Sequence, residues 1–390
     1  MSTALAPVVN PRVTTITGFV QFNGDLAQIT GTLSVLRKAK AEFASAGYEV
    51  ETLRVTTEPF PDFTGGMSDG QALAFLKQLD DLSVEENFIP NIGAAMLNDS
   101  DDPAPMHLLK RALSTLPNVE GSAIIADADG IHWKTIALAA DLVRYVSENS
   151  PDGQGNFNFA VSAMQDPYSP FFPGSYFNDE GQQFAIGLEC ANVVNDVLLL
   201  DKGNFVAALP DLTAALTKQL SAATAIVAKV ANETSWNGAC YLTTASTGGA
   251  SIGTGIEAYT GEKFGSGGTL TALRLIAEAV QAVEQSGISG LMLTVMEDKL
   301  LAQRWAEGAY GMDSLLAYSA VGVMGLDTIP LPGDIHVGQL KRIFSDVAVL
   351  ATKCKMPLSA RLVPVPWKKA GEMTSFKDPH LFNTTVHLLP

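Results

Sequence analysis

Four carboxylates near the ends of apolar stretches are the residues of this chain best suited to chemistry. They are Glu297, Asp298, Asp327 and Asp334. Carboxylates gathered at strand ends can bind a hard cation such as Mg²⁺ or Ca²⁺, with water completing the coordination shell. They can also divide acid and base roles when burial separates their pKa values. We predict Glu297 and Asp327 as catalytic residues, and all four acids as metal ligands.

The alternative for two of these acids is helix capping. Asp298 stands just before one predicted helix, and Asp334 stands before another that begins near Val337. A carboxylate in that position accepts hydrogen bonds from the free N–H groups of the first helical turn. Both roles stay open for these two acids. Glu297 and Asp327 follow successive predicted strands, an arrangement that brings side chains together at one edge of a sheet.

Two features of the chain can hold an anion. Arg361 lies on a late predicted strand, and a guanidinium can hold a carboxylate or phosphate through two parallel hydrogen bonds. We predict Arg361 as a third catalytic residue, although it can instead pair with Glu297 or Asp327. A glycine-rich turn before a strong helix offers N–H groups and the positive end of the helix dipole, or serves as an ordinary helix cap. The predicted anion contacts in this turn are Gly265, Ser266, Gly267 and Thr269.

The segment from 165 to 183 is a long loop with three prolines and five aromatic residues. A loop with that much apolar surface must pack on the protein or cover a site. We predict that Phe172 and Tyr176 line the substrate site and limit the access of water. Glu189, which follows the next predicted strand, is expected to contact the substrate as well. From 364 to 390 the prolines and lysines predict an irregular tail.

Apolar segments bounded by turn residues alternate with helical periodicity along most of the chain. Repeated strand–helix units predict a largely parallel sheet with helices outside it, either a barrel or a doubly wound open sheet. We favour one large α/β barrel domain over residues 1–390. The predicted strands are 13–20, 50–55, 122–126, 157–161, 184–188, 290–296, 322–326 and 360–363.

Charge and composition narrow the class of partner. The chain has 25 Lys and Arg against 41 Asp and Glu, a formal charge of −16, which disfavours nucleic acid and anionic membrane surfaces. The N-terminus lacks a signal-peptide pattern, and three cysteines form neither a disulfide framework nor a zinc pattern, so a cytoplasmic location is expected. No nicotinamide, flavin or pyridoxal phosphate signature is found. The apolar content of 47% is compatible with a homo-oligomer.

Several segments carry a recognisable pattern in combination. They include Pro-Phe-Phe-Pro-Gly-Ser-Tyr at 170–176, Phe-Gly-Ser-Gly-Gly-Thr at 264–269, Gly-Leu-Asp-Thr-Ile-Pro-Leu-Pro-Gly-Asp at 325–334, and the stretches 184–189, 289–298 and 357–373. Together they resemble the uncharacterised family named domain of unknown function 711, from about Arg12 to the C-terminus. The resemblance implies a ten-stranded β/α barrel similar to that of pyruvate formate-lyase and related glycyl-radical enzymes.

The chain departs from the family pattern between 238 and 247, where family members carry Gly-Ile/Leu-Asp-Thr-Ser-Pro-Ala-Pro and this sequence has no carboxylate. Glycyl-radical chemistry is not expected, because the stretch around Arg361 lacks an Arg-Val-x-Gly pattern. We predict a hydrolase- or lyase-type enzyme that acts on a small anionic molecule at the C-terminal rim of the barrel, with or without a divalent metal. The lost carboxylate favours the alternative, a catalytically silent ligand sensor or assembly subunit of the same fold.

Overall fold

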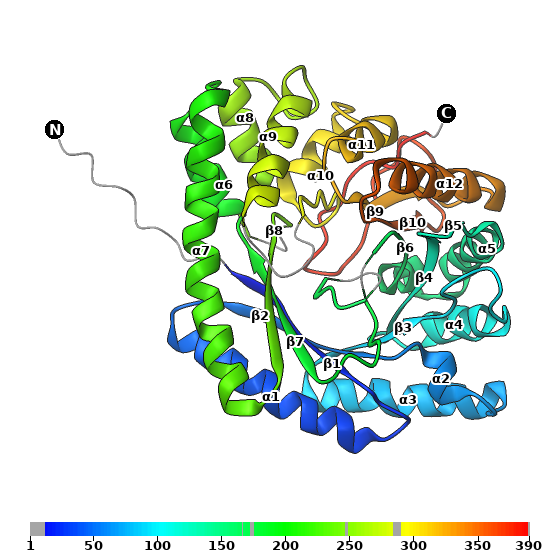
Figure 1. The fold of residues 1–390 in the computed structure, drawn as a ribbon. Helices are drawn as coiled ribbons and strands as arrows, with labels where there is room; N and C mark the ends of the chain where they lie inside the picture. The colour runs from blue at the N-terminus through cyan, green and yellow to red at the C-terminus, as the bar shows by residue number, and fades with distance from the viewer. Residues whose placement is uncertain (1–11, 166, 172–174, 246–248, 284–289, 389–390) are drawn as a thin grey trace.

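The computed structural model describes residues 12–165, 167–171, 175–245, 249–283 and 290–388. In this part of the chain, helices surround a central sheet in a single α/β domain (Figure 1). The strands are β1 (Val13–Val20), β2 (Val50–Thr57), β3 (Ile89–Ala94), β4 (Glu120–Asp127), β5 (Gly130–Ile131), β6 (Phe159–Ala163), β7 (Gln183–Glu189), β8 (Asn237–Thr243), β9 (Gly325–Pro332) and β10 (Leu358–Val365).

The helices vary widely in length, from a single turn to the long helix α7. They are α1 (Leu26–Ser45), α2 (Phe60–Thr64), α3 (Asp69–Glu86), α4 (Ala104–Thr115), α5 (Trp133–Asn149), α6 (Ala191–Leu200), α7 (Phe205–Thr234), α8 (Ile252–Thr260), α9 (Thr269–Ala282), α10 (Lys299–Ala306), α11 (Met312–Ser319) and α12 (Val337–Cys354), with a 3-10 helix at Pro151–Asn158. None of the helices in the described ranges is both long enough and apolar enough to cross a bilayer.

The sheet consists of two parallel halves that run in opposite directions. In the first half, β1, β2, β3, β4 and β6 are parallel neighbours. In the second half, β7 pairs with β8, and β9 pairs with β10, again in parallel. The halves meet at two antiparallel seams, one between β1 and β7 and one between β6 and β10. The parallel pairing expected from the sequence therefore holds within each half and reverses at the seams.

The gap between β8 and β9 is filled by residues 290–296, called here the closing segment. Gly290 forms a parallel bridge with Thr243 at the end of β8, and Thr294 forms another with Asp327 in β9. The nine strands on the path through the sheet, together with this segment, close a barrel of ten extended segments. The ten-stranded α/β barrel expected from the sequence is confirmed, and the alternative of an open doubly wound sheet is wrong.

Alternate residues of each strand face the helices and the barrel interior, as the pleat of a strand requires. On β2, Leu53 and Val55 belong to the large apolar core between sheet and helices. Thr52, Arg54 and Thr56 alternate with them and face inward, where Thr52 and Arg54 line a cavity. Polar groups in a protein interior cost free energy unless they find partners. The inward polar face of β2 therefore indicates a binding site in the barrel lumen.

In the segment 165–183, called here the aromatic loop, the described residues Tyr168, Pro170 and Phe177 contact the inner face of the barrel. The Pro170 carbonyl accepts hydrogen bonds from the Thr17 hydroxyl at 2.9 Å and from Arg54 Nη1 at 3.1 Å. Tyr168 and Phe177 form a small aromatic cluster with inner residues of β1, β7 and β8. These described residues therefore fill part of the lumen, and the role of the loop in limiting the access of water stays a prediction.

The strand β10 continues to Val365, and the described residues of the C-terminal tail follow it up to residue 388. The backbone of the tail is anchored beside the closing segment, where Phe382 N donates to the Met296 carbonyl at 2.6 Å. Trp305 Nε1 donates to the Thr385 carbonyl at 2.9 Å and fixes the last part of the tail. These contacts bring the tail to one mouth of the barrel.

Candidate active site

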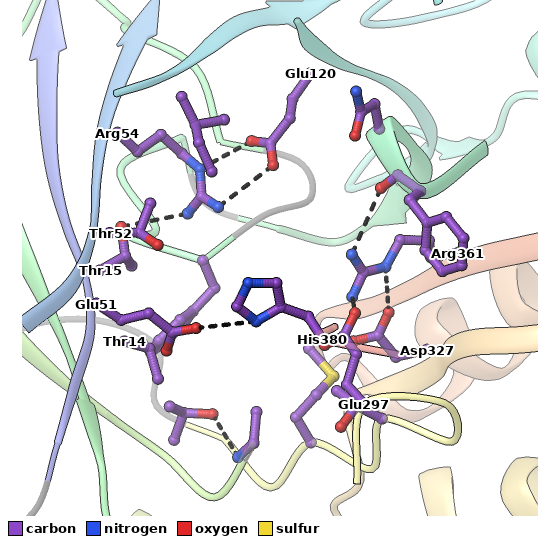
Figure 2. Close-up of a pocket in the computed structure, with 18 of the residues that line it drawn as sticks. Thr14, Thr15, Glu51, Thr52, Arg54, Glu120, Glu297, Asp327, Arg361 and His380 are labelled. Carbon is purple, nitrogen blue, oxygen red and sulfur yellow. Dashed lines mark hydrogen bonds and ion pairs between the residues drawn. The ribbon is translucent and has the colours of Figure 1, made fainter. Parts of the chain in front are cut away.

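A cavity of about 430 Å³ lies at this mouth of the barrel (Figure 2). That volume is typical of small-molecule sites in proteins. The lining combines side chains from both halves of the sheet with residues of the aromatic loop and the tail. Its members that carry a charge are Glu51, Arg54, Glu120, Glu297, Asp327, Arg361 and Asp378.

The cavity lies where the two halves of the sheet present opposite strand ends. Thr14 and Glu51 stand at the N-terminal ends of β1 and β2, and Glu120 begins β4. Thr243 ends β8, and Glu297 follows the closing segment. The predicted C-terminal rim therefore describes only half of the site, because the antiparallel seams place the N-terminal ends of the first half at the same mouth.

Arg361 joins the two acids that the sequence singles out. Its Nε donates to Asp327 Oδ1 at 2.6 Å, and its Nη2 donates to Glu297 Oε1 at 2.8 Å. Figure 2 shows the guanidinium between the two carboxylates, and no side chain of the three is more than 13% exposed. The structure thus brings Asp327 of β9 and Arg361 of β10 together with Glu297, which directly follows the closing segment.

Burial is the largest influence on the pKa of Glu297. It raises the pKa of Glu297 to about 7, while the charge of Arg361 opposes the shift and that of Asp327 adds to it. Burial acts to lower the pKa of Arg361, but the charges of Asp327 and Glu297 outweigh it and the pKa rises. One positive charge shared by two buried carboxylates leaves the Glu297 carboxyl able to gain or lose a proton near neutral pH.

A second buried ion pair in the lining is not among the sequence predictions. Arg54 Nε donates to Glu120 Oε2 at 2.8 Å, and Arg54 Nη2 donates to Glu120 Oε1 at 3.4 Å. The sequence signal for this pair is the run of polar residues at 52, 54 and 56, which alternate with apolar ones in a strand. An arginine on the inward face of a barrel strand marks the lumen as polar.

The C-terminal tail completes the mouth of the cavity. Asp378, His380 and Leu381 belong to the lining. His380 Nδ1 lies 4.0 Å from Glu51 Oε1 on β2, so the tail faces the first half of the sheet (Figure 2). Sequence reasoning missed these residues because a tail without periodicity carries no signal for where it packs.

Threonine side chains form much of the remaining polar wall. They are Thr14, Thr15, Thr52, Thr243 and Thr294. Thr294 is 2% exposed, and its hydroxyl has no hydrogen-bond partner within the described residues. A buried hydroxyl without a partner costs free energy. A bound molecule that supplies a partner for Thr294 would therefore gain affinity.

Thr243 and Asp327 flank the closing segment, where Thr243 pairs with Gly290 and Asp327 pairs with Thr294. The hydroxyls of the next residues, Thr244 and Thr328, each accept a hydrogen bond of 3.2 Å from a backbone N–H of that segment. Both Thr243 and Asp327 line the cavity. Thr243 belongs to the stretch where the family resemblance predicts a carboxylate, and the side chain it adds to the lining is a hydroxyl.

Asp298 and Asp334 do not join Glu297 and Asp327 in a metal site. Asp298 is the N-cap of α10, where its Oδ1 accepts from two backbone N–H groups of the first turn at 2.9 and 3.0 Å. Asp334 is exposed beyond the other end of β9, and His336 takes the cap position of α12. Among the residues with described positions, no group of three or more His, Cys, Asp or Glu is placed to hold a metal ion.

Substitutions at Asp298 separate capping from metal binding. Because asparagine caps a helix about as well as aspartate and alanine does not, we expect Asp298→Ala to lower the free energy of unfolding by about 2 kcal/mol. Asp298→Asn should cost about 1 kcal/mol, since it loses the bond from Ile252 N to Oδ2. Urea denaturation measures both losses. A melting temperature raised by Mg²⁺ in the wild type but not in Asp298→Asn would instead assign Asp298 to a metal site.

The glycine-rich turn lies away from the cavity. It connects α8 and α9, and the Thr269 hydroxyl accepts a hydrogen bond from Gly265 N at 3.0 Å. Gly265 has a φ of +99° and lies so close to the Ala309 carbonyl that no Cβ would fit. Close packing and turn geometry therefore explain this segment without a ligand. The residues predicted to bind an anion but absent from the lining are Gly265, Ser266, Gly267 and Thr269.

Three further predicted contacts are not found in the lining. Tyr176 is a described residue outside it, and Phe172 lies outside the described residues, whereas the neighbouring Phe171 does line the cavity. Glu189 ends β7, is 1% exposed, and its Oε2 lies 3.9 Å from Arg12 Nη1. Burial raises the pKa of Glu189 to about 7, and the charge of Arg12 opposes the shift. Contact between Glu189 and a substrate is therefore not supported.

The chain belongs to the family described as "Uncharacterised ACR (DUF711)", which matches residues 21–377. The resemblance inferred from the sequence motifs is therefore confirmed. Relatives include a UPF0210 protein of Pyrobaculum aerophilum, 29% identical over 368 residues that cover 87% of this chain and 79% of that protein. A UPF0210 protein of Methanococcoides burtonii is 25% identical over 375 residues, which cover 90% and 82% of the two chains.

Solved structures with some likeness to this chain include anaerobic ribonucleotide reductases. The enzyme from Thermotoga maritima in complex with dATP and CTP has a TM-score of 0.42 and 8% identity, with 90% of this chain and 75% of that chain covered. A second anaerobic ribonucleotide reductase has a TM-score of 0.46 and 9% identity, with coverage of 95% and 72%. Likenesses at this level carry no argument about function, and the barrel is established by its own strand pairing.

Proposed function

We propose that the protein is an enzyme that binds a small molecule in the barrel cavity and uses Glu297 as its acid–base group. The proposal is carried by the state of Glu297, which lines the cavity, is 8% exposed and has a pKa raised by burial to about 7. A carboxyl with a pKa near the working pH transfers protons most effectively. The hydrogen bond from Arg361 fixes the orientation of this carboxyl.

Hydrolase- or lyase-type chemistry suits this arrangement. Both types need a proton delivered to a leaving group or removed from water or carbon, and one carboxyl with a pKa near neutrality can do either. Arg361 supplies a fixed positive charge that can stabilise negative charge developing on a substrate oxygen. If a divalent cation takes part, Glu297 and Asp327 are the acids placed to contact it, since Asp298 and Asp334 lie elsewhere.

The anionic substrate favoured by the sequence gains little support from the lining. Arg54 and Arg361 are the guanidinium groups placed to hold an anion, and each already contacts a carboxylate at 2.8 Å or less. An incoming anion would have to displace these buried pairs, which is costly because a displaced charge stays buried. We therefore propose a small polar substrate without a requirement for negative charge.

A catalytically silent ligand sensor is the second candidate. The observation that favours it is Thr243, which lines the cavity in the stretch where the family resemblance predicts a carboxylate. Loss of one carboxylate from the cavity wall would leave the barrel and its binding surface intact while removing chemistry that needs two acids.

Depletion of metabolites distinguishes these two candidates. Wild type, Glu297→Gln and the control Glu262→Gln, which changes an exposed carboxylate outside the lining, are each incubated with a small-molecule cell extract and followed by mass spectrometry. We expect the wild type and the control to consume at least one metabolite, and Glu297→Gln to consume it about 100-fold more slowly. A metabolite that raises the melting temperature of the wild type but is never consumed would support the sensor.

A further inference from the structure

We infer that the cavity binds a small molecule bearing an ammonium group. This inference rests on the cavity proposed above as the binding site, and it names the class of ligand. Two arginines against five carboxylates give the lining a formal charge of −3 when His380 is neutral. The arginines are Arg54 and Arg361, and the acids are Glu51, Glu120, Glu297, Asp327 and Asp378.

The arginines do not offset this surplus at the surface that a ligand meets. Arg54 contacts Glu120 at 2.8 Å, and Arg361 contacts Glu297 and Asp327 at 2.8 and 2.6 Å. Three carboxylates thus neutralise both guanidinium groups within the wall. If the Glu297 carboxyl is protonated, the lining still carries more negative than positive charge.

Arg12, which is not among the lining residues, does not reverse the sign either. Its guanidinium lies 3.8 Å from Glu51, but also 3.1 Å from Glu49 and 3.9 Å from Glu189. One positive charge is therefore shared among three carboxylates. The field at the mouth stays negative and attracts cations while it repels anions.

The negative charge is carried by residues at the entrance. Glu51 comes from the start of β2, and Asp378 comes from the tail that completes the mouth. His380, two residues after Asp378, lies 4.0 Å from Glu51 (Figure 2). A ligand that enters between β2 and the tail therefore passes two carboxylates from separate parts of the chain.

Acidic side chains alone would not define the class of ligand. Two further features of the lining favour an amine. The Thr294 hydroxyl is buried without a hydrogen-bond partner in the described chain and lines the cavity, so it can accept a bond from an ammonium N–H. Phe157 and Phe171 add aromatic rings to the same lining, and aromatic faces attract ammonium groups. Charge, a hydroxyl acceptor and aromatic rings together favour an amine.

Three four-carbon probes that differ in charge test the inference. Isothermal titration calorimetry compares 1,4-diaminobutane, butane-1,4-diol and succinate at the same pH and ionic strength. We expect 1,4-diaminobutane to bind at least about tenfold more tightly than either of the others, since opposite charges attract in a partly desolvated site. Absence of 1,4-diaminobutane binding, or binding of succinate as tight as or tighter than that of the diamine, overturns the inference.

Variants at the entrance show whether the cavity is responsible. Glu51→Gln and Asp378→Asn should each weaken 1,4-diaminobutane binding about threefold to fivefold, the usual effect of one partly exposed charge. The matched control Asp334→Asn removes an equal charge from an exposed site away from the lining and should leave binding unchanged. Equal weakening in all three variants would attribute binding to the overall charge of −16 and reject the cavity. Melting temperatures confirm that each variant is folded.

Failure of this inference can be told apart from failure of the proposed function. Consumption of an anionic metabolite by the wild type, abolished in Glu297→Gln, would keep the acid–base role and reject the cationic ligand. Cavity-dependent binding of 1,4-diaminobutane, without consumption of any metabolite, would keep the ligand class and reject the enzyme.

Discussion

Replacing Arg361 with methionine is expected to lower the free energy of unfolding by about 3–5 kcal/mol at pH 8. Methionine keeps the apolar stem of the side chain but removes the guanidinium that lies 2.8 Å from Glu297 and 2.6 Å from Asp327. The two carboxylates would then stay buried without their common cation, and buried charges without partners are costly. Urea denaturation of wild type and variant at pH 8 measures the loss.

An exposed arginine provides the matched control for this substitution. Arg274 pairs with Glu278 at 2.7 Å on the surface of α9, and Arg274→Met should cost less than about 0.5 kcal/mol. The cost of Arg361→Met should also be smaller at pH 5 than at pH 8, because the pKa of Glu297, raised to about 7 mainly by burial, leaves its carboxyl protonated at pH 5. Equal costs at both pH values would show that Glu297 does not titrate between them.

The strand β3 was missed by the sequence patterns because several of its residues normally end strands. In β3, Pro90, Asn91 and Gly93 all disfavour a regular strand. The barrel uses them individually: Asn91 Nδ2 donates to Ser175 Oγ at 3.1 Å, and Gly93 has a φ of +71° against the backbone of Pro59. Such contacts come from chain segments far away in sequence, so local patterns cannot anticipate them.

The strand predicted at 322–326 shows how tertiary pairing shifts an element. In the structure β9 begins at Gly325 and runs through Pro330 to Pro332. Prolines remove hydrogen-bond donors from a sheet. Here β9 pairs with the closing segment through an isolated bridge at Asp327. The prolines beyond Asp327 therefore interrupt no regular hydrogen-bond ladder between β9 and that segment. Asp327 therefore lies inside a strand, and Asp334 is carried away from the cavity.

The sequence could predict only those residues of the candidate site that come from neighbouring segments of the barrel. Glu297, Asp327 and Arg361 come from three neighbouring segments of the second half, so the order of these segments brings them together even though Asp327 and Arg361 lie inside strands. Arg54 and Glu120 belong to the first half, whose opposite direction follows from the seams and not from any local pattern. A fully parallel sheet, as inferred from local patterns, would not bring the N-terminal strand ends of the first half to the same mouth as residues of the second half.

Glu297→Gln is expected to make the protein more stable, although it removes one partner of an ion pair. Burial raises the pKa of Glu297 from its ordinary 4.5 to about 7, so the folded state binds this proton more tightly than the unfolded state. The free energy of unfolding therefore falls as the pH rises from about 4.5 to about 7, by about 3 kcal/mol in total. Glutamine resembles the protonated carboxyl and escapes this loss. The variant should exceed wild type by about 3 kcal/mol at pH 8 and by about 1 kcal/mol at pH 5.

The same substitution at Glu120 should have the opposite sign. After Glu297→Gln, Arg361 still contacts Asp327 at 2.6 Å, whereas Glu120→Gln removes the carboxylate that both Nε and Nη2 of Arg54 contact. We expect Glu120→Gln to lose at least about 1 kcal/mol at both pH values in urea denaturation. If Glu297→Gln is less stable than wild type at pH 8, Glu297 is held ionised by Arg361 and cannot donate a proton near neutral pH. If it is more stable and also stops turnover, the buried carboxyl is kept at a cost in stability because the reaction needs it.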